Sequence, residues 1–189
     1  MLHYVELLCN YLLLLYLIRE INENENNKKA AKIRRQRGYQ WEDTIVKRFK
    51  NTEKWKAFRL GSPSIALPDV LAINTEESTI FSIEAKSGTS TSLPVPADQI
   101  ERCMEWVNTF DIFKKRNVIL AFKFLSKKRI GLGLYEKREL REYFKIWDKS
   151  LEITDCVCTY EGKFFAKING TRKEIFLKES IMPFKTKQR

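Results

Sequence analysis

Two carboxylates and a lysine stand in short apolar segments in the first half of the chain. Asp69 follows a proline at the start of the apolar run 69–74, and Glu84 and Lys86 end the run 79–86. The four polar residues between these runs indicate a β-hairpin. Because side chains alternate along a strand, Glu84 and Lys86 share one face, and Asp69 on the neighbouring strand can join them.

Charged groups in a mostly apolar strand pair are costly unless they are paired or bind a metal. Two neighbouring carboxylates repel each other, and they are the hard oxygen ligands that Mg²⁺ prefers. A lysine beside such a metal can orient water or stabilise charge on a phosphate, which is the inventory for metal-assisted phosphodiester hydrolysis. An ordinary surface hairpin with a Glu–Lys neighbour pair is the alternative. The Asp that follows Pro68, fifteen positions before Glu84, favours the metal site.

The Pro68-Asp69 pair and the Glu84-Ala85-Lys86 triplet together resemble the PD-(D/E)xK nuclease signature. Their surroundings resemble the archaeal Holliday junction resolvases over about residues 34 to 125. The matching motifs, in chain order, are Gly38 with Glu42, Arg59 with Gly61-Ser62, Pro68-Asp69-Val70-Leu71-Ala72, Ile83-Glu84-Ala85-Lys86, and the apolar strand 119–124 that contains Lys123.

The resemblance implies an α/β fold that is restriction-endonuclease-like, with a mixed central sheet flanked by helices. It implies a Mg²⁺-dependent, structure-selective DNA endonuclease, with Mn²⁺ as a substitute, that cuts four-way junctions or other branched DNA as a homodimer. Asp69, Glu84 and the Ala85 carbonyl would hold the metal, and Glu42 would complete the cluster directly or through water. Lys86 would position the attacking water or stabilise the phosphorane.

Further residues are candidates for contact with DNA. Ser62 and Arg59 would touch the scissile or an adjacent phosphate, and Gln99 is a candidate on the helix that follows the site. A plain turn serine and an exposed glutamine are the alternatives for Ser62 and Gln99. The basic side chains expected to bind the DNA backbone are Arg34, Arg35, Arg37, Arg59, Lys123, Lys127 and Lys128.

Apolar spacing predicts the remaining elements. Helix 39–51 places Glu42 on its buried stripe, near the N-terminal end that favours a carboxylate. The predicted strands are 55–60, 117–126 and 130–135, the predicted helices 96–110 and 140–147, and the predicted polar loop 87–92. Two or three strands follow within 151–177, with a hairpin turn at 169–170.

Composition restricts the partners. The net charge of +11 favours a polyanion, either nucleic acid or an anionic membrane surface. Residues 27–59 hold twelve Lys and Arg against three acids, so this charge is concentrated. The four cysteines and one histidine form no zinc pattern, and Cys156 and Cys158 would share a strand face, a poor geometry for a disulfide. We therefore expect a reducing compartment, the cytoplasm, with the protein associated with the nucleoid.

Three regions are expected along the chain: an apolar N-terminal segment and linker (1–27), the nuclease domain (28–147) and a β-rich C-terminal extension with a basic tail (148–189). The apolar run in residues 4–18 is shorter than the roughly 20 residues of a membrane span. It is interpreted as an extra packed helix, as a weak membrane anchor, or as the result of a start site assigned too far upstream.

Two other functions fit the sequence. One is a nuclease of the same fold with another DNA substrate, of the restriction or repair type. The other is a non-catalytic basic DNA-binding protein, although Glu42, Asp69, Glu84 and Lys86 all have the residue types that catalysis needs.

Overall fold

The computed structural model describes residues 28–29, 31–33, 35–60, 66–168 and 170–186. The chain divides into two units, residues 1–37 and residues 38–189. The described part of the first unit is helical, and all elements below belong to the second. None of the described helices has both the length and the apolar character needed to cross a membrane. The apolar segment 1–27 and the candidates Arg34 and Ser62 lie outside the described residues.

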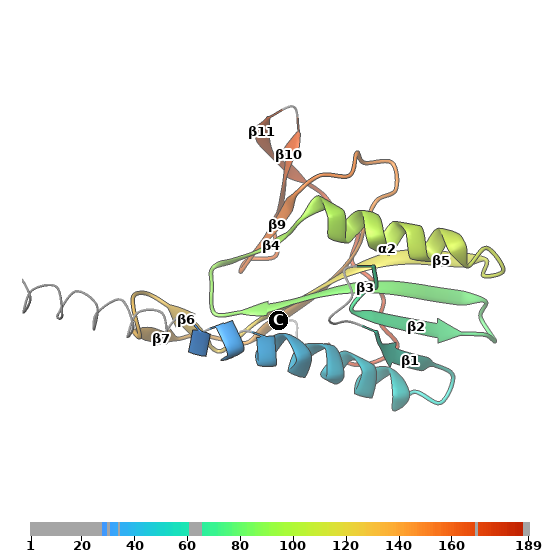
Figure 1. The fold of residues 1–189 in the computed structure, drawn as a ribbon, viewed down its shortest axis with the longest axis horizontal. Coiled ribbons are helices and arrows are strands. Elements are labelled where there is room, and N and C mark those ends of the chain that lie inside the picture. Colours follow the sequence, from blue (N-terminus) through green and yellow to red (C-terminus); the bar gives the residue numbers. More distant parts are fainter. Residues whose placement is uncertain (1–27, 30, 34, 61–65, 169, 187–189) are drawn as a thin grey trace, which may run out of the picture. The chain divides into compact units, whose positions relative to one another are not determined.

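A five-stranded mixed sheet forms the centre of the second unit (Figure 1). Its middle strands β3 and β5 run parallel, and the other neighbours are antiparallel, which confirms the predicted mixed sheet. In spatial order the strands are β1 (Lys56–Arg59), β2 (Val70–Asn74), β3 (Thr79–Gly88), β5 (Lys115–Phe124) and β8 (Arg141–Ile146).

Residues 38–50 form a helix that covers one face of this sheet (Figure 1). The predicted stripe is confirmed, since Glu42, Ile45, Val46 and Phe49 are all buried. Trp41 joins them, and its indole Nε1 donates to the Ala121 carbonyl of β5 at 3.2 Å. This bond pins the start of the helix to the centre of the sheet.

Helix α2 (Ala97–Thr109) covers the opposite face, with Ile100, Cys103 and Val107 in the core. A second sheet packs into the same core, in the order β11-β10-β9-β4. Its strands are β4 (Ser92–Val95), β9 (Cys156–Thr159), β10 (Phe164–Ile168) and β11 (Thr171–Ile175). The predicted C-terminal strands and the hairpin between β10 and β11 are confirmed, and Gly170 has the positive φ of 75° that this turn requires.

The predicted polar loop 87–92 is wrong at both ends. Ser87 and Gly88 continue β3, and Ser92 already belongs to β4. The serines and threonines of this segment are typical of a loop. Its ends are nevertheless strand, because their backbones pair with β5 and β9, which the sequence pattern does not reveal.

The predicted helix 140–147 is also wrong, because this segment forms strand β8. Phe144 and Ile146 face the core under helix 38–50, whereas Tyr143 and Trp147 face the α2 side. A strand that is covered on both faces carries apolar residues on both. In β8 the resulting spacing of apolar residues resembles the spacing along one face of a helix.

The predicted strand 130–135 is a turn. The strands are instead β6 (Lys127–Arg129) and β7 (Tyr135–Lys137), which form a separate two-stranded hairpin. Gly133 adopts a φ of 71° between them, a backbone conformation that a strand does not use.

The three cysteines in the described residues, Cys103, Cys156 and Cys158, are buried and free, as predicted. Burial raises the pKa of Cys103 and Cys156 to about 12, so these thiols stay protonated and unreactive.

Candidate active site

The β2–β3 hairpin brings Asp69, Glu84 and Lys86 together. Val70 lies opposite Ile83, so Asp69 lies directly beside the Glu84–Ala85 peptide. The Ala85 backbone N–H donates to Asp69 Oδ2 at 2.8 Å. Ala85 faces the core under helix 38–50, so its neighbours Glu84 and Lys86 face the α2 side. The predicted shared face is therefore present.

Glu84 is almost completely buried, with 1% of its side chain exposed, and it accepts hydrogen bonds from two cations. Lys86 Nζ lies 2.6 Å from its Oε1, and Arg102 of α2 donates to its Oε2 at 3.0 Å. Desolvation nevertheless raises the pKa of Glu84, the positive charge of Lys86 lowers it, and the charge of Asp69 raises it again. The carboxylate thus lies in an environment that favours a further positive charge.

Sequence reasoning missed Arg102. It lies three positions after Gln99, so both side chains project from neighbouring positions on the first turns of α2. Gln99 Oε1 is buried without a hydrogen-bond partner. The available signal was the spacing of Gln99 and Arg102, two polar residues three positions apart near the start of an amphipathic helix. Only tertiary packing shows which strand these side chains contact.

Glu42 reaches the same region from helix 38–50. Arg59 Nη1 lies 3.9 Å from its Oε2, an atom that has no hydrogen-bond partner although it is buried. Desolvation raises the pKa of Glu42 to about 7; Asp69 and Glu84 contribute in the same direction, and Arg59 opposes them. Glu42 therefore senses the charges of Asp69 and Glu84. That the three acids act as one metal-binding cluster stays a prediction.

The acids do not form a closed metal cage. Among the residues that the structure describes, no three His, Cys, Asp or Glu side chains are grouped closely enough to hold a metal ion. Mg²⁺ does not need such a cage, because it is usually bound by one or two carboxylates while water and substrate phosphate complete its shell. Asp69 and Glu84 supply that number, and the orphaned Oε2 of Glu42 fits a water-mediated contact. The residues present fit a divalent cation.

The predicted DNA contacts are spread over several elements. Arg59 is bound to Asp43 at 3.2 Å and stacks on Tyr39. Lys123 lies over the Trp41 ring, on the face of the sheet opposite Lys86. Lys127 and Lys128 lie on β6, whereas Arg35 and Arg37 belong to the other unit. Their contact with DNA stays a prediction.

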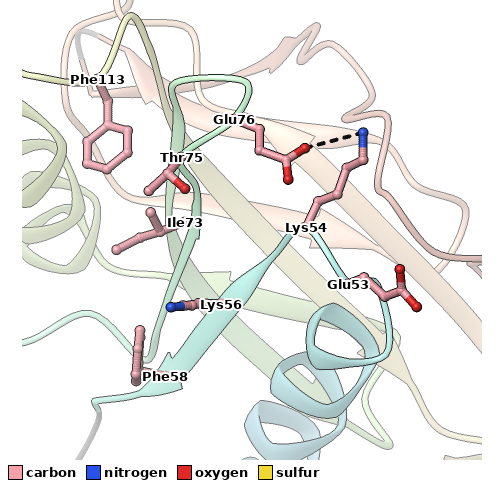
Figure 2. A pocket seen from close by; sticks show the side chains of 8 residues that line it. All are labelled: Glu53, Lys54, Lys56, Phe58, Ile73, Thr75, Glu76 and Phe113. Carbon is pink, nitrogen blue, oxygen red and sulfur yellow. Dashed lines mark ion pairs between the residues drawn. The ribbon is translucent and has the colours of Figure 1, made fainter.

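A pocket of about 410 Å³ opens at the other end of the β2–β3 hairpin (Figure 2). Lys54 and Glu76, which pair at 3.4 Å, line it together with Phe58, Ile73 and Phe113. Ile73 stands four residues from Asp69, about 13 Å along an extended strand. The pocket is therefore separate from the carboxylates of Asp69 and Glu84.

Comparison with known families places this site in context. The sequence matches the family described as archaeal Holliday junction resolvase (Hjc) over residues 33–162. The chain belongs to this family. The match includes Glu42, Asp69, Glu84 and Lys86, so the resemblance predicted from the sequence is confirmed. The chain is accordingly a Holliday junction resolvase nuclease, a DNA-binding endonuclease of recombination and repair.

Among solved structures, the chain is similar to the 1.6 Å structure of Hjc, a Holliday junction resolvase from the archaeal hyperthermophile Archaeoglobus fulgidus. The sequence identity is 16%, the TM-score is 0.43, and the alignment covers 66% of this chain and 85% of that one. No curated protein sequence matches the chain.

Proposed function

We propose that this resolvase is a Mg²⁺-dependent, structure-selective endonuclease that resolves four-way DNA junctions by paired nicks. The observation that carries the proposal is the placement of Asp69, Glu84 and Lys86 on one face of the sheet, with Asp69 bonded to the Ala85 amide at 2.8 Å. This arrangement fixes two carboxylates and one ammonium group on neighbouring strands, independent of any flexible loop.

In this proposal Asp69 and Glu84 would hold the metal, the Ala85 carbonyl would be a further ligand, and Glu42 would complete the cluster directly or through water. When bound, Mg²⁺, or Mn²⁺ in its place, would supply a Lewis acid for the phosphate and the leaving oxygen. Two acids and a nearby third would carry the negative charge that recruits it. Burial is the largest cause of the raised pKa values of Glu42 and Glu84, and the charge of Asp69 adds to both.

The remaining side chains position the substrate and the water. Lys86 keeps its ammonium group at the Glu84 carboxylate, 2.6 Å away, where it can hold the attacking water or stabilise the charge of the phosphate. Arg102 keeps Glu84 in place from the opposite side. Gln99 Oε1 offers an unused acceptor on the same helix, and Arg59, with Ser62, contacts a neighbouring phosphate.

Paired nicks need two such sites. The part of the chain that the structure describes contains one cluster of this kind, so a second copy must supply the other. A closed two-fold homodimer is the commonest assembly and matches the near two-fold symmetry of a junction. Sedimentation at micromolar concentration, followed by cleavage of a cruciform plasmid, tests this. A monomer that only nicks would contradict the dimer and favour a general nuclease. A DNA substrate of this kind would be met at the nucleoid in the cytoplasm.

Single-turnover cleavage of a four-way junction tests the assigned residues. Asp69→Asn and Lys86→Met should each remove cleavage while junction binding persists, because both side chains act on the metal and the water. Glu77→Gln is the matched control, since Glu77 is an exposed acid in the turn of the same hairpin. Wild-type cleavage rates for Asp69→Asn at saturating Mg²⁺ would show that the assigned site is wrong.

A further inference from the structure

The tip of the β6–β7 hairpin is an unusually exposed apolar surface. Ile130, Leu132 and Leu134 are 59%, 92% and 62% exposed. Figure 1 shows the hairpin projecting beyond the end of β3 and away from α2. Exposed single hydrophobic residues are ordinary, but three within five residues on one projecting turn indicate an interaction site.

The tip has a defined shape. Ile130 N–H donates to the Leu134 carbonyl at 3.1 Å, and Leu134 N–H donates to Gly131 at 3.4 Å. The Arg129 side chain also donates to the Gly131 carbonyl, at 3.3 Å. Gly133, at a φ of 71°, turns the chain so that the leucines stand on the outside. The turn is therefore organised before any partner binds.

Basic residues flank this apolar tip. Strands β6 and β7 carry four of them, against the single acid Glu136. Among the residues that the structure describes, the ion pair between these strands is the loose Lys128–Glu136 contact of 3.8 Å, so the net charge of the strands stays strongly positive. The basic residues are Lys127, Lys128, Arg129 and Lys137. Apolar groups bordered by cations fit a polyanion that also offers an apolar interior.

The base of the hairpin is tied to the catalytic strand. Leu125 N–H donates to Gly88 at 2.9 Å, and Arg129 N–H donates to Thr89 at 3.0 Å. The Arg138 side chain bridges Leu125 and Ser90, with 2.9 Å to each carbonyl. Gly88 is the last residue of β3, two positions after Lys86. The position of the tip is thus fixed relative to the candidate active site.

We propose that the tip formed by residues 130–134 is a wedge that enters the branch point of the DNA and unstacks the bases there, while the basic strands hold the adjacent phosphates. Proteins that kink DNA insert Leu or Ile between base steps in this way, and the cost is lowest where stacking is already broken. A branch point is such a place. This inference rests on the proposed function, because it assumes a branched DNA substrate.

Geometry also limits where the cut lies. Leu132 follows Arg129 by three residues. Arg129 is hydrogen-bonded to Thr89, which follows Lys86 by three residues. Six extended residues span at most about 20 Å. At 3.4 Å per nucleotide along one strand, the cut therefore falls within about six nucleotides of the branch point.

The test uses a four-way junction with 2-aminopurine at the branch point, whose fluorescence rises when the base unstacks. The full-length wild-type protein should raise the signal on binding. Leu132→Ser should lose most of this rise and cleave about tenfold more slowly, while its affinity for the junction changes by less than about threefold, because the phosphate contacts remain. Ile181→Ser, which removes an apolar side chain that is 93% exposed elsewhere, should behave as the wild type.

Two results would overturn the wedge: an unchanged fluorescence rise and cleavage rate in Leu132→Ser, or an equal loss in Ile181→Ser. A defect of Leu132→Ser only in sedimentation or in binding to anionic vesicles would also overturn it, because the tip would then contact a second copy or lipid. Leu134→Ser repeats the test at a second position should Leu132→Ser fold poorly by circular dichroism. Failure of the wild type to cut any branched DNA would instead contradict the proposed function.

Discussion

Two buried glutamates on either side of the central strand β5 have the same exposure and different surroundings. Glu84 on β3 and Glu142 on β8 are each 1% exposed, and each is bound to cations at hydrogen-bond distance. Glu142 receives both bonds from one guanidinium, that of Arg48, at 2.7 and 2.9 Å. Glu84 is held by Lys86 and Arg102, which come from a strand and a helix.

Glu84 has other negative charges nearby. Asp69 raises the pKa of Glu84, and Glu42 senses both of these acids. Arg48, by contrast, is a fork-shaped partner that joins helix 38–50 to the edge strand β8, and its guanidinium packs against Trp41. A single bidentate pair between two elements stabilises the fold, whereas several acids gathered around one cation-bound glutamate are arranged for a ligand.

The sharpest way to separate the two glutamates is to neutralise Glu84. Glu84→Gln should reduce single-turnover junction cleavage at least about a thousandfold, because a metal-bound carboxylate contributes several kcal/mol to the transition state. The loss of stability should stay well below that of the Glu142 variant, since burial and the charge of Asp69 already disfavour a charged Glu84. A Glu84→Gln protein that cuts within about tenfold of the wild-type rate would contradict the proposed functional difference between Glu84 and Glu142.

Neutralising Glu142 should have the opposite consequence. Glu142→Gln leaves the Arg48 guanidinium without its bidentate partner, and breaking a buried pair in this way costs about 3 kcal/mol. Urea denaturation should therefore show a lower midpoint with an unchanged slope. Cleavage per folded molecule should match the wild type. A specific loss of cleavage in a stably folded Glu142→Gln protein would place Glu142 in the catalytic machinery.

Glu42 should make the stability depend on pH. Between about pH 4.5 and about 7 the folded protein retains a proton on Glu42 that the unfolded chain releases. The free energy of unfolding therefore falls as pH rises through this window, by at most about 3 kcal/mol from this group. Glu42→Gln should remove that part of the slope and be the more stable protein at pH 8, when both are compared by urea denaturation. Parallel pH profiles would contradict the raised pKa.

The smallest effect concerns the basic arm, residues 28–37, in the first unit. Each phosphate contact that the arm makes adds about −0.9 to the slope of log K against log salt on duplex DNA. Replacing Arg35 and Arg37 with Gln should therefore flatten the slope by at most about two. Fluorescence anisotropy over a salt series measures it. An unchanged slope would mean that both arginines are solvated and that DNA lies elsewhere.

The sequence predicted the β2–β3 hairpin well because the information is local. Strand alternation alone places Glu84 and Lys86 on one face, and the short turn places Asp69 beside them. The helix stripe that contains Glu42 was equally local. Arg102 was missed because its contact with Glu84 depends on how α2 packs across β3, a property that no window of sequence contains.

The wrongly predicted helix and strand also have physical causes. Strand β8 is apolar on both faces because a core lies on each side of it, so Tyr143 and Phe144 imitated a helical stripe. In the turn 130–134, apolar residues alternate with glycine as they would along a strand. There the exposed leucines and the positive φ of Gly133 show that local pattern and burial are independent.

The central claim is that the Asp69–Glu84–Lys86 cluster cuts branched DNA with a divalent metal. The most direct measurement places a four-way junction beside a linear duplex of the same sequence, with and without Mg²⁺, for the wild type and Asp69→Asn. We expect the wild type to make paired cuts in the junction only when Mg²⁺ is present, little cleavage of the duplex, and no product from Asp69→Asn. Equal cleavage of junction and duplex, cleavage without metal, or binding without any cleavage by the wild type would contradict the account.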